Sequence, residues 1–550
     1  MYLKYKSLSI VINNRLFIFV RLSVLIRYIN QFLSSNCNKT SLISPLIFLT
    51  IAKVKPMFLI SRYRLFYLFF VATLFVTPVS ATDSTALGKL LMEKGFFTQH
   101  ELNRLEKGIS IEQLLLEKGL INQEEMNSVE KQQTPGAVLS STDQEELETS
   151  LFEKLTKKIE DDAPFDAGYG KNGFFIKSKD GNWATNLRWR AQMRYTNPYR
   201  SDPRQYDDFT NADQSTFELR RVRMKIGGHG YQPWLKYYFE VDLQPTRDSE
   251  DSSTNASTRL IDWRLTMDKY KWFSVRAGQW KINYNRERVD SSGRQTFVER
   301  SIVNRAFTVD RQMGVMAFGR LFPGTLADMN YYAGVFNGEG RGVKNDDSDM
   351  MYMGRLQWNF LGRELKWRQS DVGFSEKPAG NIAFAAATTT GKCTRWSSSG
   401  CGNLDGFSKV SAATAGQYKI DQMMEETAFK WRGFAWQQEL HWKRISDRVN
   451  DTESQMVGGY AQAGYFFHDL IPVVPKNMEV AFRYAFVDEA NEQDISLSNT
   501  RQEFTGAINY FISGHNNKLT LDVSHLTLDD AFLNKDISDQ RVRFQWDVSF

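Results

Sequence analysis

The last ten residues of the chain, 541–550, read Arg-Val-Arg-Phe-Gln-Trp-Asp-Val-Ser-Phe. Polar and apolar side chains alternate along the whole stretch, and neighbouring side chains of a β-strand point to opposite faces of its sheet. The segment therefore predicts a strand with one polar and one apolar face, which ends on the aromatic side chain of Phe550.

The same period of two recurs from about residue 168 onward. Six further segments alternate in this way: 186–195, 221–226, 235–242, 261–267, 480–486 and 518–523. Short turns such as 227–230 alternate with long polar connections such as 245–257. Strands of about 9–11 residues joined in this manner are typical of membrane-spanning β-barrels. A soluble sandwich also alternates, but the terminal strand ending at Phe550 resembles the assembly signal of outer-membrane proteins and favours the barrel.

We therefore predict an all-β fold over residues 166–550, a closed antiparallel transmembrane β-barrel preceded by a small helical N-terminal region. Closure is required because every backbone N–H in lipid must be paired within the protein. At roughly 22–26 residues for a strand and its share of loop, the segment has room for about 16 strands. A barrel of that width encloses an aqueous channel instead of a packed interior.

A signal peptide is predicted at residues 57–81, where two arginines precede the apolar run 65–76 and a small-residue cleavage site ends at Ala81. Residues 1–56 would then be an upstream extension that is absent from the mature protein. The alternative is a membrane anchor at residues 16–29, a run that two arginines interrupt.

Residues 82–165 are predicted to be helical and to lie in the periplasm. Residues 91–96 and 115–120 echo each other, which indicates two helix–turn–helix units. Farther along, an apolar residue recurs every fourth position at Leu147, Leu151, Leu155 and Ile159. This pattern predicts an amphipathic helix, which either forms a short coiled coil between protomers or packs on its own chain.

Composition excludes several classes of function. The formal charge of the 550 residues is +5, too small a net charge to indicate nucleic-acid binding. None of the 6 histidines belongs to a His-x-x-x-His zinc motif, and a Gly-x-Ser-x-Gly elbow is lacking. We therefore predict no enzyme, no catalytic residue, no cofactor and no metal. Cys393 and Cys401 lie close together in a Gly/Ser/Thr-rich stretch, where they either form a disulfide or remain two free thiols.

If the apolar sides of the strands face lipid, their polar sides face water inside the barrel, and arginine dominates those polar sides. A cationic side chain costs about 2–4 kcal/mol at the bilayer midplane, so these residues are expected to line the pore. The predicted pore-lining and anion-binding residues of the strands are Arg188, Arg190, Arg194, Arg221, Arg223, Lys225, Arg264, Arg276, Arg355, Arg483, Arg541 and Arg543. Cationic linings favour anions, and guanidinium groups bind oxyanions through two donors. The alternative is that the arginines pair with carboxylates and stiffen the wall.

The segment 281–311 fits poorly to a plain hairpin, because it is long and dense in both signs of charge. A loop of this kind that folds inward would narrow the pore and set its filter. The candidate filter residues are Arg286, Arg288, Arg300, Arg305 and Arg311. The alternative is an external loop.

Several motifs, in order along the chain, resemble the phosphate-selective porin O and P family. They are Phe217-Glu218-Leu219-Arg220-Arg221-Val222-Arg223, Val275-Arg276-Ala277-Gly278-Gln279-Trp280-Lys281, Phe297-Val298-Glu299-Arg300-Ser301, Arg311-Gln312-Met313-Gly314 and residues 458–465. The resemblance covers roughly residues 166–550. It implies a trimeric barrel of about 16 strands, an inward third loop and a ladder of arginines leading to a lysine-lined constriction. The sequence departs from this pattern in the candidate loop, whose one lysine is Lys281.

We therefore expect a porin in the outer membrane of a Gram-negative bacterium, for passive diffusion of small solutes with a preference for anions such as phosphate or polyphosphate. The expected partners are outer-membrane lipid, small anions, further copies of the chain in a homotrimer, and the barrel-assembly machinery, which would bind the C-terminal strand at Phe550. A nucleic-acid partner is not expected. The alternative is a non-selective or a structural, adhesive barrel whose helical region contacts the cell wall or a partner.

Overall fold

The computed structural model describes most of the chain from residue 97 onward. The described residues are 92, 97–118, 123, 126, 164–170, 172–198, 215–243, 258–345, 347–398, 400–404, 406–490, 498–530 and 534–550. The predicted extension (1–56), the signal peptide (57–81) and the amphipathic helix with Leu147 to Ile159 lie outside these residues and stay predictions. The chain divides into two units, Met1–Leu155 and Thr156–Phe550. In the described part of the chain, we find no helix that is long and apolar enough to cross a membrane.

The first unit contains two short helices, α4 (Gln99–Glu106) and α5 (Ile111–Glu117). Helix α4 begins with a capping box, in which the Thr98 side chain accepts from the backbone of Glu101 and the Glu101 carboxylate accepts from the backbone of Thr98. Arg104 of α4 forms an ion pair of 2.6 Å with Glu117 of α5. Between the helices lies a small apolar core of Phe97, Leu105, Ile111 and Leu114.

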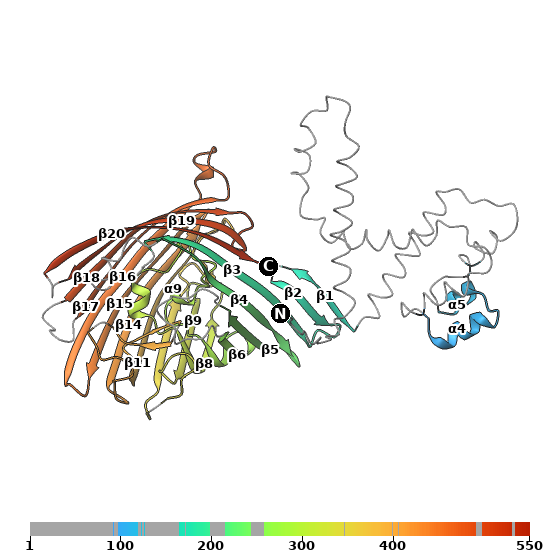
Figure 1. The fold of residues 1–550 in the computed structure, drawn as a ribbon, viewed down its shortest axis with the longest axis horizontal. Helices are drawn as coiled ribbons and strands as arrows, with labels where there is room; N and C mark the ends of the chain where they lie inside the picture. Colours follow the sequence, from blue (N-terminus) through green and yellow to red (C-terminus); the bar gives the residue numbers. More distant parts are fainter. Residues whose placement is uncertain are drawn as a thin grey trace, which may run out of the picture. The chain divides into compact units, whose positions relative to one another are not determined.

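The second unit is a closed antiparallel β-barrel of 16 strands. The strands are β3 (Ala184–Asn197), β4 (Thr216–Gly230), β5 (Gln232–Asp242), β6 (Arg259–Tyr270), β7 (Phe273–Lys281), β8 (Arg311–Leu321), β9 (Met329–Phe336), β10 (Met351–Trp358), β11 (Ala379–Gly391), β14 (Tyr418–Trp431), β15 (Phe434–Asp447), β16 (Thr452–Tyr465), β17 (Met478–Ala490), β18 (Ser498–Phe511), β19 (Asn517–Asp530) and β20 (Lys535–Ser549). Each pairs with the next, and β20 pairs with β3. Figure 1 shows these strands side by side along the barrel wall. The predicted fold class is confirmed.

Strand β3 completes the closure with two partners on one edge. Its later residues pair with β20, from Asn197 opposite Val542 to Arg190 opposite Ser549. The backbone N–H of Phe550 then donates to the carbonyl of Trp189 at 3.1 Å. The first residues of β3 pair instead with β2 (Gly173–Ser178), which forms a hairpin with β1 (Phe165–Gly170). The last residue of the chain therefore lies in the continuous ladder that closes the barrel.

The alternation of the sequence becomes the two faces of the wall. On β14, the side chain of Met423 on the outer face is 58% exposed, whereas Glu426 on the inner face is fully buried. On β20, Phe544 and Trp546 are exposed on the outer face, and Arg543 is buried on the inner face. The interior of this barrel therefore contains many buried polar side chains, beside an apolar cluster that includes Phe307. Both pack against segments that enter from the two ends.

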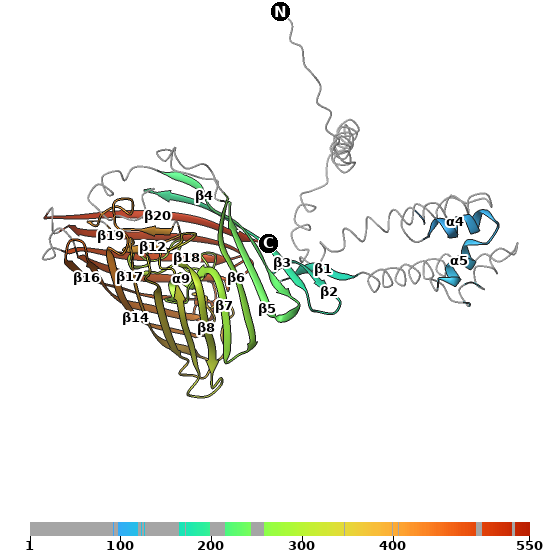
Figure 2. The same cartoon turned by 90° about the horizontal axis from the view of Figure 1, so that it is seen from below.

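Three connections enter the barrel. The first, residues 282–310 between β7 and β8, is named the inner loop and contains α9 (Arg286–Val289) and α10 (Val303–Phe307). The second, residues 359–378 between β10 and β11, is named the inner turn. The third joins β11 to β14 and carries the small hairpin β12 (Arg395–Ser397) and β13 (Gly400–Gly402). A short 3-10 helix, η3 (Phe467–Asp469), follows β16. In Figure 2, α9 and β12 are seen among the barrel strands.

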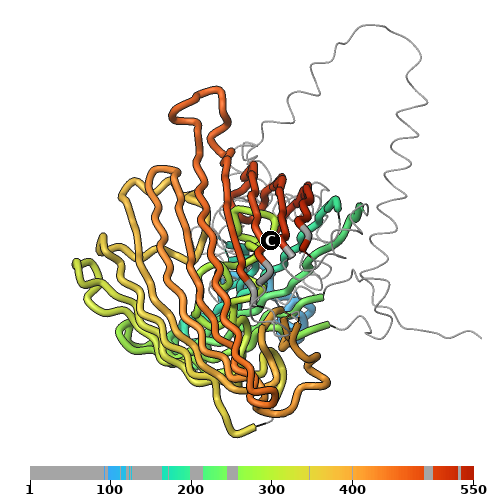
Figure 3. The backbone as a smooth tube through the Cα atoms, turned by 90° about the vertical axis from the view of Figure 1, so that its left-hand side faces the viewer, coloured from blue at the N-terminus to red at the C-terminus, as the bar shows by residue number. Residues whose placement is uncertain are grey.

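The inner loop crosses the barrel and contacts walls that are far from it in sequence. The backbone N–H of Val298 donates to Asp522 of β19 at 2.9 Å, and that of Ile302 donates to Glu503 of β18 at 3.0 Å. The backbone N–H of Thr296 donates to Gln369 of the inner turn at 2.7 Å. Figure 3 follows the strands around the barrel as a tube. The mixed-charge segment thus folds inward instead of forming an external loop.

Candidate lumen site

Glu426 of β14 fixes the inner loop to the barrel wall. Its carboxylate accepts from Nε of Arg286 at 2.8 Å and from Nη2 of Arg355 at 2.9 Å, and all three side chains are buried. The ring of Trp367, from the inner turn, lies 4.8 Å from the guanidinium of Arg286 and 5.2 Å from that of Arg355. One carboxylate and one indole therefore hold two of the predicted pore arginines in place.

Three other predicted filter arginines also form hydrogen bonds to carboxylates or backbone carbonyls of the protein. Arg288 holds both carboxylate oxygens of Asp310, and Arg311 places its Nε 2.5 Å from Asp262 of β6. Arg300 donates to three backbone carbonyls of the inner loop. Such charge-assisted bonds are strong and directional, so these side chains give the loop its shape.

Most of the predicted wall residues likewise have a partner. Arg543 donates to both oxygens of Asp522 at 2.8 Å. The remaining contacts are Arg483 with Glu503, Arg194 and Arg221 with Glu299, Arg223 with Glu240 and Asp242, Lys225 with Glu240, Arg190 with Ser291 and Ser292, and Arg188 with Asn516. Arg541 is buried on β20, and Arg305 is partly buried on α10. So many pairs stiffen the wall. This agrees with the alternative interpretation, in which the arginines pair with carboxylates.

A cavity of about 270 Å³ remains between the inner loop and the wall formed by β4 to β7. Its lining holds six cationic and two acidic side chains, together with two aromatic rings. The cations are Arg223, Lys225, Arg264, Arg276, Lys281 and Arg294, the acids are Glu240 and Asp262, and the rings are those of Tyr238 and Trp367. A lining with this imbalance attracts anions.

Four of the cations in this cavity form no ion pair among the described residues. One is Lys281, which donates to two backbone carbonyls of the inner loop, and the other three are arginines. Arg264 lies over the ring of Tyr238, at 4.5 Å from its centre, and Arg276 donates to the hydroxyl of Thr266 at 3.3 Å. Arg294 is on the inner loop, where burial lowers its pKa, and the nearby charges of two further arginines lower that pKa as well. The three guanidinium groups retain donors that a solute oxyanion can use.

Sequence reasoning missed three residues near this cavity. Arg294 lies in the predicted filter segment but was not among the candidates, and Trp367 and Arg368 lie in the inner turn. The inner turn has no regular period and carries Arg363, Lys366 and Arg368 within six residues. That local density of cations was the one available signal, and it does not reveal that the turn points inward.

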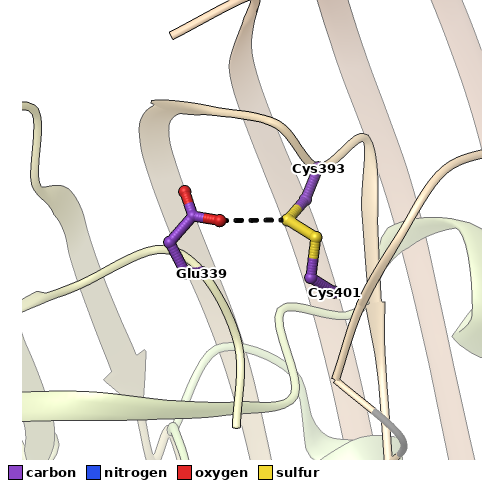
Figure 4. A group of neighbouring side chains, drawn as sticks. All are labelled: Glu339, Cys393 and Cys401. Carbon is purple, nitrogen blue, oxygen red and sulfur yellow. Dashed lines mark hydrogen bonds between the residues drawn. A yellow bond between two sulfur atoms is a disulfide. The ribbon is translucent and has the colours of Figure 1, made fainter. Parts of the chain in front are cut away.

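Cys393 and Cys401 form a disulfide in the connection between β11 and β14. Figure 4 shows the carboxylate of Glu339 directed at the sulfur of Cys393, at 3.4 Å. These three residues have the spacing of a metal site, but sulfurs that are joined in a disulfide offer no thiolate to a metal. Nearby, the indole N–H of Trp396 donates to the carbonyl of Gly338 at 2.6 Å. The disulfide therefore holds a folded-in connection in shape.

A comparison with protein families finds a match over residues 193–550 to the family described as phosphate-selective porin O and P. None of the curated proteins matches the chain. Among solved structures, the chain is similar to the outer membrane channel DcaP of Acinetobacter baumannii, at 13% identity and a TM-score of 0.43 over 68% of this chain and 99% of that one. It is also similar to the anion-selective porin from Comamonas acidovorans, at 11% identity and a TM-score of 0.42 over 67% of this chain and 100% of that one.

Proposed function

Because this chain belongs to the phosphate-selective porin O and P family and is an outer-membrane porin, we propose that its lumen passes small anions in preference to cations. Phosphate and polyphosphate are the proposed solutes, since guanidinium groups bind tetrahedral oxyanions through paired N–H donors. The solute moves by diffusion, and the barrel performs no chemical step on it.

The observation that carries this proposal is the charge of the cavity beside the inner loop. Its two carboxylates, Glu240 and Asp262, are each held by an arginine, at 3.1 Å from Arg223 and 2.5 Å from Arg311. Arg264, Arg276 and Arg294 face the same space with no carboxylate partner among the described residues. An anion there would meet uncompensated positive charge, whereas a cation would meet carboxylates that are already paired.

Assembly and location form part of the same proposal. The barrel would lie in the outer membrane of a Gram-negative bacterium, with the helices of residues 82–165 in the periplasm, and three copies would form a homotrimer. Phe550 would serve as the signal that the barrel-assembly machinery recognises. The outward position of Phe550, which is 50% exposed at the end of β20, supports this role.

The test is the zero-current potential of the channel in a planar bilayer under a KCl gradient. We expect the sign of an anion-selective pore, and we expect the double variant Arg264→Glu with Arg276→Glu to move the potential toward cation selectivity. Arg444→Gln is the matched control, because Arg444 lies on the outer face of β15, where it pairs with Asp421 at 2.8 Å. A cation-selective wild type, or a double variant with unchanged potential, would refute the proposal.

A further inference from the structure

Five parts of the chain meet around His515, which lies in the turn between β18 and β19. Lys518 of β19 donates to the carbonyl of Gln295 in the inner loop at 2.5 Å. Lys430 of β14 donates to the carbonyl of Ser370 in the inner turn at 2.9 Å. Arg188 of β3 donates to Asn516, the residue that follows His515. These contacts bring the neighbouring Arg294 and Arg368 to the same place.

The resulting group, named the histidine cluster, consists of His515, Arg188, Arg294, Arg368, Lys430 and Lys518. It lies at the end of the barrel where the chain terminates, since the backbone N–H of Ser549 donates to the carbonyl of Asn516 at 2.7 Å. The cavity of the proposed function is lined by other residues, and Arg294 is the one member that the two share.

The imidazole of His515 lacks hydrogen-bond partners in this cluster. Neither ring nitrogen has a hydrogen-bond partner among the described residues, and both nitrogens are buried. One ring neighbour is Phe511, which meets it edge-on at 5.4 Å. Burial holds the pKa of His515 well below its ordinary value, and the charges of Lys518, Lys430, Arg294 and Arg368 lower that pKa further. A buried imidazole without a partner is costly unless something supplies one.

Several carboxylates lie near the cluster, and two of them accept hydrogen bonds from groups outside it. Glu479 of β17 accepts from Ser370 and Asn509. Asp371 of the inner turn accepts from Ser375 and from the backbone N–H of Gly433. Asp290 acts on Lys430 and Arg294, and Asp547 of β20 acts on Lys518. None of these carboxylates forms an ion pair with one of the five cations of the cluster among the described residues.

We propose that the histidine cluster is a second anion site, which binds a doubly charged oxyanion at the C-terminal end of the pore. The inference rests on the proposed function, because the anion reaches the cluster through the lumen. Arg294 and Arg368 supply guanidinium N–H donors, and the imidazole of His515 supplies another. The charge of the bound anion offsets the five cations and favours protonation of His515, so binding strengthens as the pH falls.

The probe is sulfate, whose charge does not change between pH 6 and 8. Single channels in planar bilayers are titrated with sulfate from each side, and the concentration that halves the chloride current is measured. We expect this concentration to rise about tenfold in Arg368→Gln for sulfate added at the C-terminal end of the barrel, the effect of about 1.4 kcal/mol of lost binding. We expect His515→Asn to remove the pH dependence of sulfate block.

Arg432→Gln is the control, because Arg432 is an exposed arginine in the turn between β14 and β15 at the same end of the barrel. It should leave sulfate block unchanged. Equal block in wild type and Arg368→Gln would overturn the second site, while an anion-selective KCl potential would leave the proposed function standing. If the variants do not fold, the pH dependence of sulfate block in the wild type provides the test. Block that stays constant from pH 8 to 6 would also overturn the second site.

Discussion

Asp290 closes α9 in the inner loop, and its side chain is fully buried. Neither of its carboxylate oxygens has a partner among the described residues, although Arg300 donates to its backbone carbonyl at 2.6 Å. Burial raises the pKa of Asp290 to about 7 from an ordinary value of 3.8, against the opposing charges of Arg286, Lys430 and Arg300. At a pH between these two values, the carboxyl group of Asp290 is protonated in the folded loop, whereas it would be ionised in a detached loop.

The sign of the resulting pH dependence follows from that difference. The inner loop is held most firmly below the ordinary pKa of Asp290, and it loses this stability as the pH rises toward 7. We expect hydrogen exchange of residues 285–301, corrected for intrinsic rate, to be faster at pH 8 than at pH 5. Asp290→Asn copies the neutral form and should flatten the difference. If hydrogen exchange in Asp290→Asn rises with pH as much as in the wild type, another group is responsible.

At the residue scale, sequence identifies the type of the lumen residues but not their pairing. The period of two indicates that Arg543 and Arg483 face the interior, and both are buried there. Their partners, Asp522 and Glu503, lie on neighbouring strands and depend on the register, which a single sequence does not specify. Because pairing decides which guanidinium remains available to a solute, the importance of Arg294 appears only in three dimensions.

At the element scale, close approach between strands requires glycine at particular positions. A Cβ added to Gly228 of β4 would lie 1.8 Å from the carbonyl oxygen of Ala184 on β3. We expect Gly228→Ala to lower the free energy of unfolding by about 1–3 kcal/mol, the usual effect of overpacking. Gly506→Ala on β18 is the control, because its Cβ would meet nothing within 4 Å. Urea titration of the folded, heat-modifiable form measures both, and equal losses would contradict this account of the strand contact.

Strands and connections differ in how far the sequence predicts them. Alternation predicts β3, β6 and β20 because a membrane barrel imposes a lipid face and a lumen face on every strand. The mixed charges of segment 281–311 also indicate an inward loop. The inner turn was not predicted, because its direction depends on tertiary bonds such as that of Ser370 to Glu479 at 2.8 Å.

At the scale of the whole molecule, selectivity depends on a few residues and not on the total number of arginines. The closed ladder from β3 to β20 places the polar faces of all 16 strands around one lumen. Many of the cations there pair with carboxylates, of which Glu426, Glu503 and Asp522 also hold the inner loop. Cations without an ion pair among the described residues remain at Arg264, Arg276 and Arg294 beside the cavity, and in the histidine cluster. The proposed anion pathway is thus the space beside the cations that form no ion pair.

The most direct measurement of this claim is anomalous X-ray scattering from crystals of the protein soaked in bromide and, separately, in rubidium. We expect bromide peaks in the cavity within contact distance of the guanidinium groups of Arg264, Arg276 and Arg294, and no rubidium there. Rubidium peaks beside Glu240 and Asp262, with the cavity free of bromide, would contradict the account.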